Sequence, residues 1–319
     1  MDIKEKLNLI KKNVVEIISE EELVNLLKSK EKPIVYCGYE PSGNMHLGHF
    51  VTITKLIDFQ KAGFKVIVLL ADVHAMLNRK GSIEEINSYV NIWKKTIKAI
   101  GLNAEVVTGS SFQFSQDYIL DVMKMSQEIT LHRGLRSMTE VGRDMENATI
   151  SQLLYPLMQI ADIKALKCDI AYGGIEQRKI HMLAREMKDI INYNPIVVHT
   201  PLITSLKGPG SKMSKSIPGS GIAVTDSDEE IKKCISNAYC PEKSNEDNPL
   251  LQIMQLIIFP RIDELEIKRP EKFGGNIIFK NYEELEKYYV EGKLHPLDLK
   301  NAVTKELIKV ISPIRENFK

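Results

Sequence analysis

The sequence lacks the long apolar runs and the cysteine frameworks that mark several protein classes. No run approaches the length of a membrane span, and the N-terminal Met1-Asp-Ile-Lys-Glu-Lys has no apolar core of a signal peptide. The four cysteines have neither the spacing of a metal site nor that of a disulfide framework: Cys37, Cys168, Cys234 and Cys240. We therefore expect a cytoplasmic protein with reduced thiols, no protein-bound metal and no membrane contact.

An excess of one charge is also missing. The 43 Lys and Arg residues nearly balance the 42 Asp and Glu residues, which leaves a net charge of +1. Nucleic acid would therefore have to bind at a local basic patch and not over the whole surface. With 319 residues, 43% of them hydrophobic, the chain is long enough for two domains with their own cores.

Strand-like and helix-like segments alternate over the first two thirds of the chain. Phe64–Ala71 is a nearly continuous apolar run, as expected of a buried parallel strand. Ser82 and Glu85 form a capping-box pattern that predicts the start of a helix. Further segments predict strands at Ile34–Tyr36, Ala104–Thr108, 167–173 and 195–199, and helices at 14–30 and 176–188. This alternation indicates an α/β fold with a Rossmann-like doubly wound parallel sheet and ligands at the carboxyl ends of its strands.

Two changes of pattern divide the chain further. Residues 111–150 are rich in Met and charge and predict a helical insertion. After Thr225 the pattern becomes helical, with helices expected at 226–238, 246–258, 281–290 and 296–312. We expect a first domain over residues 1–222 and a smaller all-helical domain over residues 223–319.

A histidine pair follows the first strand of the sheet. The segment from Tyr36 to His49 predicts a strand, a tight Pro/Ser/Gly turn and a helix that begins near His46 and His49. We expect these histidines to share a helical face, where imidazoles and free backbone N–H groups can bind phosphate. Gly48 in this turn lets a ligand approach the backbone. Such a pair alone is more often structural.

A lysine-rich loop lies far downstream. Lys212-Met-Ser-Lys215-Ser stands within the loop 208–221, whose flanking glycines are Gly208, Gly210, Gly219 and Gly221. A loop of this kind is usually solvated, but it can also bring ammonium groups onto a polyphosphate. The histidine pair and this loop, in this order around an α/β pattern, indicate transfer of a nucleotidyl group from ATP.

A buried helix carries a polar stripe. Residues 153–163 are apolar nearly all round, yet Tyr155, Gln159 and Asp162 fall on one helical face. Buried polar groups need partners, and either an internal hydrogen-bond network or a small polar ligand can supply them. Beside a nucleotidyl-transfer motif, we favour the ligand.

These motifs resemble a known family. His46-Leu-Gly-His and Lys212-Met-Ser-Lys-Ser are similar to the two signatures of class I aminoacyl-tRNA synthetases, and nearly the whole chain resembles the archaeal and eukaryotic type of tyrosyl-tRNA synthetases. The resemblance implies that Tyr36 and Asp162 hold the phenol of tyrosine. It also implies that Tyr155, Gln159 and Gln177 surround its α-amino group. A phenol donates and accepts, so a carboxylate and a hydroxyl together satisfy it.

The resemblance also implies the reaction. Tyrosine and ATP would form tyrosyl-adenylate, and tyrosine would then pass to the 3′ end of tRNA(Tyr). We assign His46 and His49 to the phosphates of ATP, Gly48 to its adenine or ribose, and Lys212 and Lys215 to the β- and γ-phosphates. Mg²⁺ would accompany ATP, and the sequence shows no dedicated carboxylate cage for it. Three further polar residues at strand ends would lie near the ligands or act as solvated caps: Glu40, Asp72 and His74.

Contacts with tRNA are implied in both domains. Arg178 and the inserted Arg133 and Arg136 resemble a surface that reads the first acceptor-stem base pair, although a solvated basic face is equally compatible. Phe273, His295 and Asp298 match elements of the family that read the anticodon, with Phe273 stacking on a base. Asp298 can alternatively be a helix cap. The insertion is expected to form a homodimer interface.

Three alternatives stay open from the sequence. A tryptophanyl-tRNA synthetase can also use a carboxylate, for an indole N–H, although the full set of five pocket residues favours tyrosine. A catalytically silent RNA-binding relative would not need both histidines and both lysines. A nucleotidyltransferase that does not act on tRNA would not need the helical domain with its basic and stacking residues.

Overall fold

The chain folds into two compact units. The computed structural model describes residues 1–210, 213 and 217–318. The first unit comprises Met1–Gly43, Lys55–Lys95 and Leu102–Pro201, and the second comprises Asn44–Thr54, Thr96–Gly101 and Leu202–Lys319. Two helices contribute residues to both units: α3 (Leu47–Lys61) and α5 (Ile83–Ile100).

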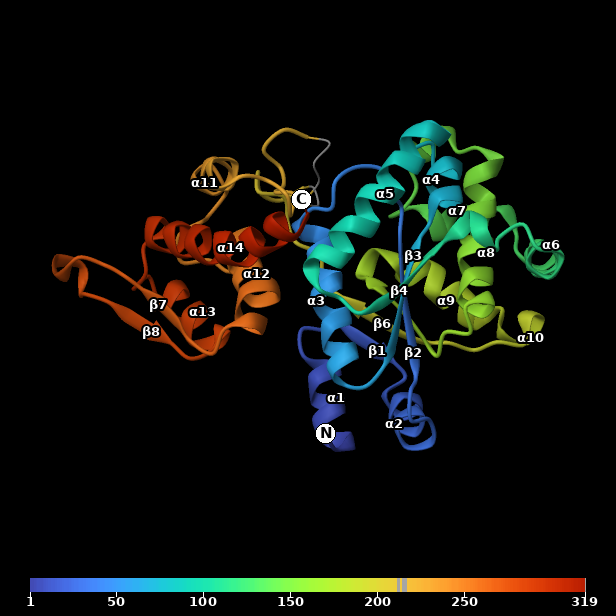
Figure 1. Cartoon of the computed structure of the whole chain (residues 1–319), viewed down its shortest axis with the longest axis horizontal. Coiled ribbons are helices and arrows are strands. Elements are labelled where there is room, and N and C mark those ends of the chain that lie inside the picture. The colour runs from blue at the N-terminus through green and yellow to red at the C-terminus, as the bar shows by residue number, and fades with distance from the viewer. Residues whose placement is uncertain (211–212, 214–216, 319) are drawn as a thin grey trace. The chain divides into compact units, whose positions relative to one another are not determined.

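A six-stranded sheet forms the centre of the first unit (Figure 1). Its strands are β1 (Glu16–Ile18), β2 (Ile34–Tyr39), β3 (Lys65–Leu70), β4 (Ala104–Thr108), β5 (Ile170–Gly174) and β6 (Ile196–Thr200). They lie in the order β1-β6-β5-β2-β3-β4, and only the pairing of β1 with β6 is antiparallel among these described strands. The predicted Rossmann-like fold is confirmed. The order reverses between β2 and β5, which is where such sheets bind ligands.

Helices of the first unit surround this sheet. They are α1 (Ile3–Lys11), α2 (Glu20–Ser29), α4 (Asp72–Leu77), α6 (Gln116–Glu128), α7 (Leu131–Met138), α8 (Ile150–Ala165), α9 (Arg178–Glu186) and α10 (Lys188–Ile191). The predicted capping box is confirmed: the Ser82 N–H donates to Glu85 at 2.8 Å, and the Glu85 N–H donates to Ser82 Oγ at 3.2 Å. The predicted insertion supplies α6 and α7, which both contact α8.

The helix predicted over residues 14–30 is wrong in its first part. Ile17 and Ile18 belong to β1, where Ile17 pairs with Val198 of β6. The helix α2 begins only after Ser19, whose hydroxyl accepts from the Glu22 N–H at 3.2 Å. β-branched side chains fit a strand well, so an available sheet edge prevails over the helical pattern here.

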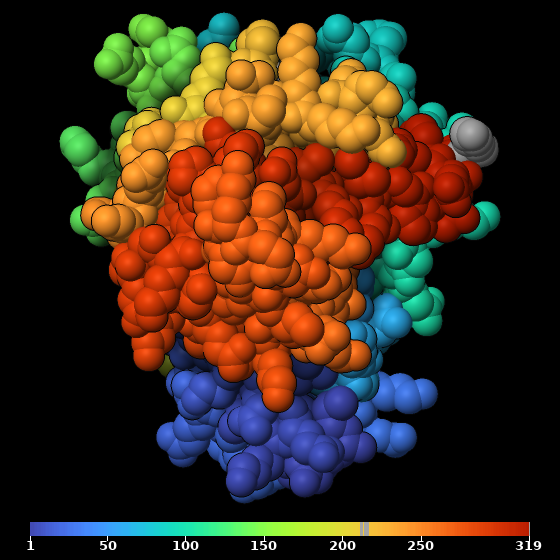
Figure 2. Space-filling view, turned by 90° about the vertical axis from the view of Figure 1, so that its left-hand side faces the viewer, coloured from blue at the N-terminus to red at the C-terminus, as the bar shows by residue number. Residues whose placement is uncertain are grey.

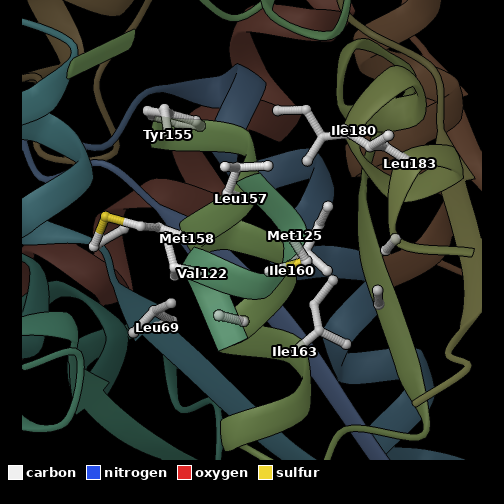
Figure 3. Close-up of a cluster of buried hydrophobic side chains, with 14 of the residues drawn as sticks. Leu69, Val122, Met125, Tyr155, Leu157, Met158, Ile160, Ile163, Ile180 and Leu183 are labelled. Carbon is white, nitrogen blue, oxygen red and sulfur yellow. The ribbon is translucent and has the colours of Figure 1, made fainter. Parts of the chain in front are cut away.

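A hydrophobic core of the first unit lies around α8. Figure 3 shows Met158 of α8 near Leu69 of β3 and Val122 of α6, while Ile180 and Leu183 lie on α9. These side chains are all at least nine-tenths buried. A helix that is covered on most sides can hold polar groups in fixed positions, which matters for the stripe that it carries.

The second unit is mainly helical, but the all-helical domain predicted for residues 223–319 needs a correction, because two short strands pair within it. Its further elements are α11 (Asp228–Ser236), α12 (Pro249–Ile253), α13 (Tyr282–Val290) and α14 (Pro296–Phe318), with β7 (Leu265–Ile267) and β8 (Ile277–Phe279). The two strands form an antiparallel pair that the sequence analysis did not anticipate. Figure 2 shows the exposed side of this part of the unit, in orange and red. Within the described ranges, no helix is long and apolar enough to span a membrane.

Candidate active site

Asp162 of α8 is the centre of a buried polar cluster in the first unit. Its Oδ1 accepts from Gln113 Nε2 at 2.7 Å and from the Tyr118 hydroxyl at 2.8 Å. Its Oδ2 is buried and has no hydrogen-bond partner among the described residues. Burial raises the pKa of Asp162 to about 7, against a usual value of 3.8, because the ionised carboxylate loses hydration. The sequence analysis missed Gln113 and Tyr118, which reach Asp162 only through the fold.

His74 at the start of α4 lies beside this carboxylate. Its Nε2 is 3.7 Å from Asp162 Oδ2. Burial lowers the pKa of His74 to about 4, so the ring is neutral at neutral pH and the contact is no ion pair. Gln113 Nε2 lies 3.4 Å from His74 Nδ1, and because an amide nitrogen only donates, the ring proton is on Nε2. His74 Nε2 and Gln113 Oε1 are both buried without a partner among the described residues.

Tyr36 of β2 belongs to the same cluster. It is 1% exposed. Its pKa lies well above the usual value because of burial and, next, because of the nearby Asp162 charge. The structure therefore brings together Tyr36 and Asp162, as the resemblance implied, and adds a donor and acceptors around them. A small ligand with one hydroxyl group can donate to Asp162 and accept from His74.

Tyr155 and Gln159 continue the polar stripe of α8. The Tyr155 hydroxyl donates to Glu40 Oε1 at 2.8 Å, and Gln159 Nε2 donates to Gln177 Oε1 at 3.1 Å. Both residues are buried, with exposures of 4% and 7%. The structure thus joins Glu40 and Gln177, from distant parts of the sequence, to the predicted stripe. These groups form an acceptor-rich region suited to an ammonium group.

Two further carboxylates, those of Asp72 and Glu176, have buried oxygen atoms. Asp72 is buried and its Oδ1 accepts from the Ser110 N–H at 2.9 Å, so it is not a solvated cap. Glu176 precedes Gln177, and its Oε2 is buried without a hydrogen-bond partner among the described residues. The sequence analysis had not singled out Glu176.

The histidine pair lies in the second unit. His46 precedes α3 and pairs with Ala223 in an isolated β-bridge, while His49 lies in the first turn of the helix. The two imidazole centroids are 3.8 Å apart. The expectation of free N–H groups needs a correction: the Leu47 N–H donates to Ile222 O at 2.9 Å, and the Gly48 N–H to His46 Nδ1 at 3.1 Å. Residues 222–224 pair with the segment before α3 like a short strand, and they therefore accept one of the N–H groups at the start of this helix.

These hydrogen bonds fix the polarity of both imidazoles. His46 Nδ1 accepts from the Gly48 N–H, and His49 Nδ1 accepts from the His46 N–H at 3.3 Å. An imidazole whose Nδ1 accepts a hydrogen bond carries its proton on Nε2. Gly48 is needed for this packing, because a Cβ atom there would lie 2.9 Å from His46 Cε1.

Most of the segment Lys212–Ser216 in the lysine-rich loop lies outside the described residues. Lys212 and Lys215 are not among them, so the roles assigned to both stay predictions. Met213 between them is buried, and its N–H donates to Ile203 O at 3.1 Å. Gly208, Gly210 and Gly219 have φ angles of 104°, 95° and 75°, which favour glycine.

The predicted anticodon residues lie in the second unit. Phe273 is 60% exposed, as a stacking residue requires. His295 Nδ1 accepts from the Leu297 N–H at 3.1 Å, so His295 and not Asp298 caps the start of α14. Arg269 links the two segments, donating to Gly275 O at 3.1 Å and to Lys293 O at 3.0 Å. The sequence analysis missed Arg269.

The predicted acceptor-stem arginines differ in their surroundings. Arg136 is exposed on α7. Arg133 forms two hydrogen bonds with Glu186, at 3.1 and 2.7 Å, and Arg178 donates to Glu16 at 2.6 Å. Arg133 and Arg178 therefore already have anionic partners, which an RNA phosphate or base would have to share or replace.

The described part of the chain holds four free cysteines and no cluster of possible metal ligands. Across residues 1–210, 213 and 217–318, no three or more His, Cys, Asp and Glu side chains are grouped to hold a metal ion. All four cysteines are free thiols. Burial raises the pKa of Cys37 to about 12, which keeps this thiol protonated and unreactive.

Known proteins resemble the chain over its full length. The family of tRNA synthetases class I (W and Y) matches residues 28–312. The tyrosine–tRNA ligase of Methanospirillum hungatei is 51% identical over 312 residues, covering 97% of each chain. That of Methanosarcina mazei is 48% identical over 316 residues, covering 98% of this chain and 99% of the relative.

A solved structure agrees with these relatives. The tyrosyl-tRNA synthetase of Archaeoglobus fulgidus complexed with L-tyrosine superposes with a TM-score of 0.96 at 48% identity, and the match covers 100% of both chains. The fold, the histidine motif and the buried polar stripe fit the same assignment. The chain belongs to the class I tRNA synthetases, and within them to the tyrosyl-tRNA synthetases of the archaeal and eukaryotic type.

Proposed function

We propose that the protein is an ATP-dependent ligase that joins L-tyrosine to tRNA(Tyr). The tyrosine carboxylate attacks the α-phosphorus of ATP, forming tyrosyl-adenylate and releasing pyrophosphate. A terminal ribose hydroxyl of the tRNA then attacks the tyrosyl carbonyl, and AMP leaves. A carboxylate nucleophile needs no general base in the first step, so catalysis consists of positioning and charge stabilisation.

One observation carries the choice of substrate. Asp162 Oδ2 and His74 Nε2 lie 3.7 Å apart, buried and without hydrogen-bond partners among the described residues. A phenol hydroxyl can donate to the first and accept from the second, whereas phenylalanine would leave both unpaired. An indole N–H only donates, so tryptophan would satisfy Asp162 and not His74. Asp162 and His74 therefore select the phenol of tyrosine, beside the buried Tyr36.

The α-amino group binds at the other end of the polar stripe. An ammonium group needs acceptors, and Glu40 offers a carboxylate that already accepts from Tyr155. Gln159 and Gln177, which are hydrogen-bonded to each other, offer amide oxygens. We assign Tyr155, Gln159 and Gln177 to this group, with Glu40 as the anion that balances its charge.

ATP binds through the two signature motifs. His46 and His49 donate from Nε2 to its phosphates, and Gly48 allows its adenine or ribose to approach the helix start. Lys212 and Lys215 neutralise charge on the β- and γ-phosphates as pyrophosphate leaves. Mg²⁺ enters with ATP as part of the substrate complex.

The tRNA binds to two sets of residues. Arg136 and Arg178 contact its acceptor end, from a catalytic domain that we place at residues 1–222. Phe273, His295 and Asp298 read the anticodon, from a helical domain at residues 223–319. The exposed ring of Phe273, the histidine cap of α14 and the link through Arg269 support this second assignment.

We also assign a homodimer to the inserted helices. Several large apolar side chains of this region are exposed, at 38% to 70%: Phe114, Ile119, Leu120, Met123 and Leu131. Ile119, Leu120 and Met123 lie together on α6, and a soluble chain usually covers such a group with a partner. A second copy of this chain is the partner that the family resemblance implies.

Amino acid-dependent exchange of pyrophosphate into ATP tests the function. Tyrosine should support exchange, and tryptophan and phenylalanine should support little. Asp162→Ala should lower kcat/KM for tyrosine about 100-fold, the loss expected for a hydrogen bond to a buried charge. Asp121→Ala, which removes a carboxylate of α6 outside the pocket, serves as the control. Exchange driven equally by tryptophan, or full activity of Asp162→Ala, would contradict the assignment.

A further inference from the structure

A row of hydrogen-bonded side chains crosses the first unit from its surface to Gln159. Arg178 Nε donates to Glu16 Oε1 at 2.6 Å, and the same oxygen lies 2.9 Å from His199 Nδ1. His199 Nε2 lies 2.9 Å from His181 Nδ1, and His181 Nε2 lies 3.4 Å from Gln159 Nε2. Helices α8 and α9 and strands β1 and β6 supply these residues.

Both histidines are neutral members of this row. His181 and His199 are 1% and 0% exposed, and their rings stack with centroids 5.1 Å apart. Burial lowers the pKa of both, and the neighbouring His199 lowers the pKa of His181 further. Two charged imidazoles in contact would repel each other in a site that water does not reach.

The Glu16 carboxylate sets the direction of every hydrogen bond. A carboxylate only accepts, so His199 must donate from Nδ1. A neutral His199 then accepts at Nε2, and His181 must donate to it from Nδ1. His181 in turn accepts at Nε2, where the only polar neighbour that the described contacts supply is the Gln159 amide nitrogen.

The direction of these hydrogen bonds decides that the amide nitrogen of Gln159, and not its amide oxygen, faces His181. One amide hydrogen of Gln159 goes to His181 and the other to Gln177 Oε1, at 3.1 Å. The two ends of a carboxamide have nearly the same shape, so its hydrogen-bond partners select the orientation. In the opposite orientation the amide oxygen would face the lone pairs of His181 Nε2 and Gln177 Oε1.

We propose that His181 and His199 are positioning residues, which, oriented by Glu16, hold the Gln159 amide with its oxygen toward the α-ammonium group of tyrosine. The inference rests on the proposed function, because that function places the ammonium group beside Gln159. Neither histidine touches the substrate. Their contribution reaches the substrate only through the Gln159 oxygen.

Two substitutions at the surface end test the row without disturbing the buried rings. Glu16→Gln keeps an oxygen that can accept from Arg178 and His199. Glu16→Leu removes this acceptor, so that His199 can carry its proton on the other ring nitrogen and the direction of the hydrogen bonds can reverse. Glu16→Leu should raise KM for tyrosine in pyrophosphate exchange about ten-fold, with kcat changed less than about two-fold. Glu16→Gln should stay near wild type. KM for ATP should not change in either variant.

His181→Phe, which keeps a ring and removes both hydrogen bonds, tests the inner end. It should raise KM for tyrosine by a similar factor, but it should have no further effect in a Gln159→Ala background. It should also leave exchange with 3-(4-hydroxyphenyl)propionate, which lacks the ammonium group, unchanged relative to wild type. A melting temperature for each variant separates loss of folding from loss of binding.

Two results would overturn the inference. One is that His181→Phe loses as much activity in the Gln159→Ala background as in wild type, or as much with 3-(4-hydroxyphenyl)propionate as with tyrosine. Either result would indicate a purely structural role of His181. The other is wild-type KM in both Glu16→Leu and His181→Phe. Failure of the proposed function looks different, because the wild-type protein itself would then show no tyrosine-dependent exchange.

Discussion

The proposed tyrosine pocket and the candidate anticodon surface place their side chains in opposite settings. In the pocket, Asp162 is 1% exposed and its unpaired oxygen lies among other buried groups. On the candidate anticodon surface, Phe273 is 60% exposed and His295 is solvent-exposed. A buried polar group loses its hydration whether or not a ligand is bound, so the buried polar groups of the proposed pocket lower the stability of the fold. An exposed residue has no such cost, and its contribution appears only when a partner binds.

The largest expected effect concerns stability at the pocket. The pKa of Asp162 in the folded protein is about 7, above its usual 3.8, so the folded state holds this proton more tightly than the unfolded state does. Stability should therefore fall as pH rises from about 4 to 7 and then stay low. Asp162→Asn, which removes the charge, should be more stable than wild type at pH 8 by up to about 4 kcal/mol, with no difference near pH 4.

Chemical denaturation at pH 4, 6 and 8 measures this difference. Asp298→Asn on the other surface is the matched control and should change stability little at any of these values. A constant difference between Asp162→Asn and wild type across this range would show that the buried carboxylate is not the cause. The same Asn variant should lose tyrosine activation, because stability and activity oppose each other at this residue.

The next largest effect concerns the lysine loop. Lys212→Ala and Lys215→Ala should each lower the rate of adenylate formation about 100-fold, while the dissociation constant of ATP changes far less. The reason is that charge builds up on the leaving pyrophosphate mainly in the transition state. Single-turnover kinetics with varied ATP separates the two quantities, and weaker ATP binding at an unchanged rate would point to a ground-state role.

A smaller and more selective effect is expected at the anticodon surface. Asp298→Ala should lower tRNA charging about ten-fold, as for one lost hydrogen bond to a base, and leave tyrosyl-adenylate formation near normal. A change of the first anticodon base should then matter less to the variant than to wild type. Measuring both half-reactions decides the matter. A parallel loss of adenylation would mean that Asp298 supports the fold instead.

The smallest effect should be that of Phe273 on stability. Since its ring is mostly exposed, Phe273→Ala should change the free energy of unfolding by less than about 0.5 kcal/mol. Tyr36→Ala in the pocket, where the ring is fully buried, should cost about 3 kcal/mol or more. Urea titrations of both variants measure these changes in the free energy of unfolding. Similar losses of stability in the two variants would contradict the prediction.

Local patterns in the sequence determined much of this protein. The apolar run at Phe64–Ala71 predicted β3, and the Ser82 and Glu85 pair predicted the start of α5, because strands and capping boxes depend on neighbouring residues. The spacing of Tyr155, Gln159 and Asp162 likewise placed them on one buried helix, since helical periodicity alone sets which residues share a face.

Only the tertiary structure decided which groups surround that stripe. Gln113, Tyr118 and His181 lie outside α8, and no local pattern distinguishes them from other polar residues. Ile17 and Ile18 became a strand because the edge of β6 was available to them. In each case the deciding hydrogen bond joins residues far apart in the chain. A sequence read in order shows which groups need partners, and the packed fold decides which partners they have.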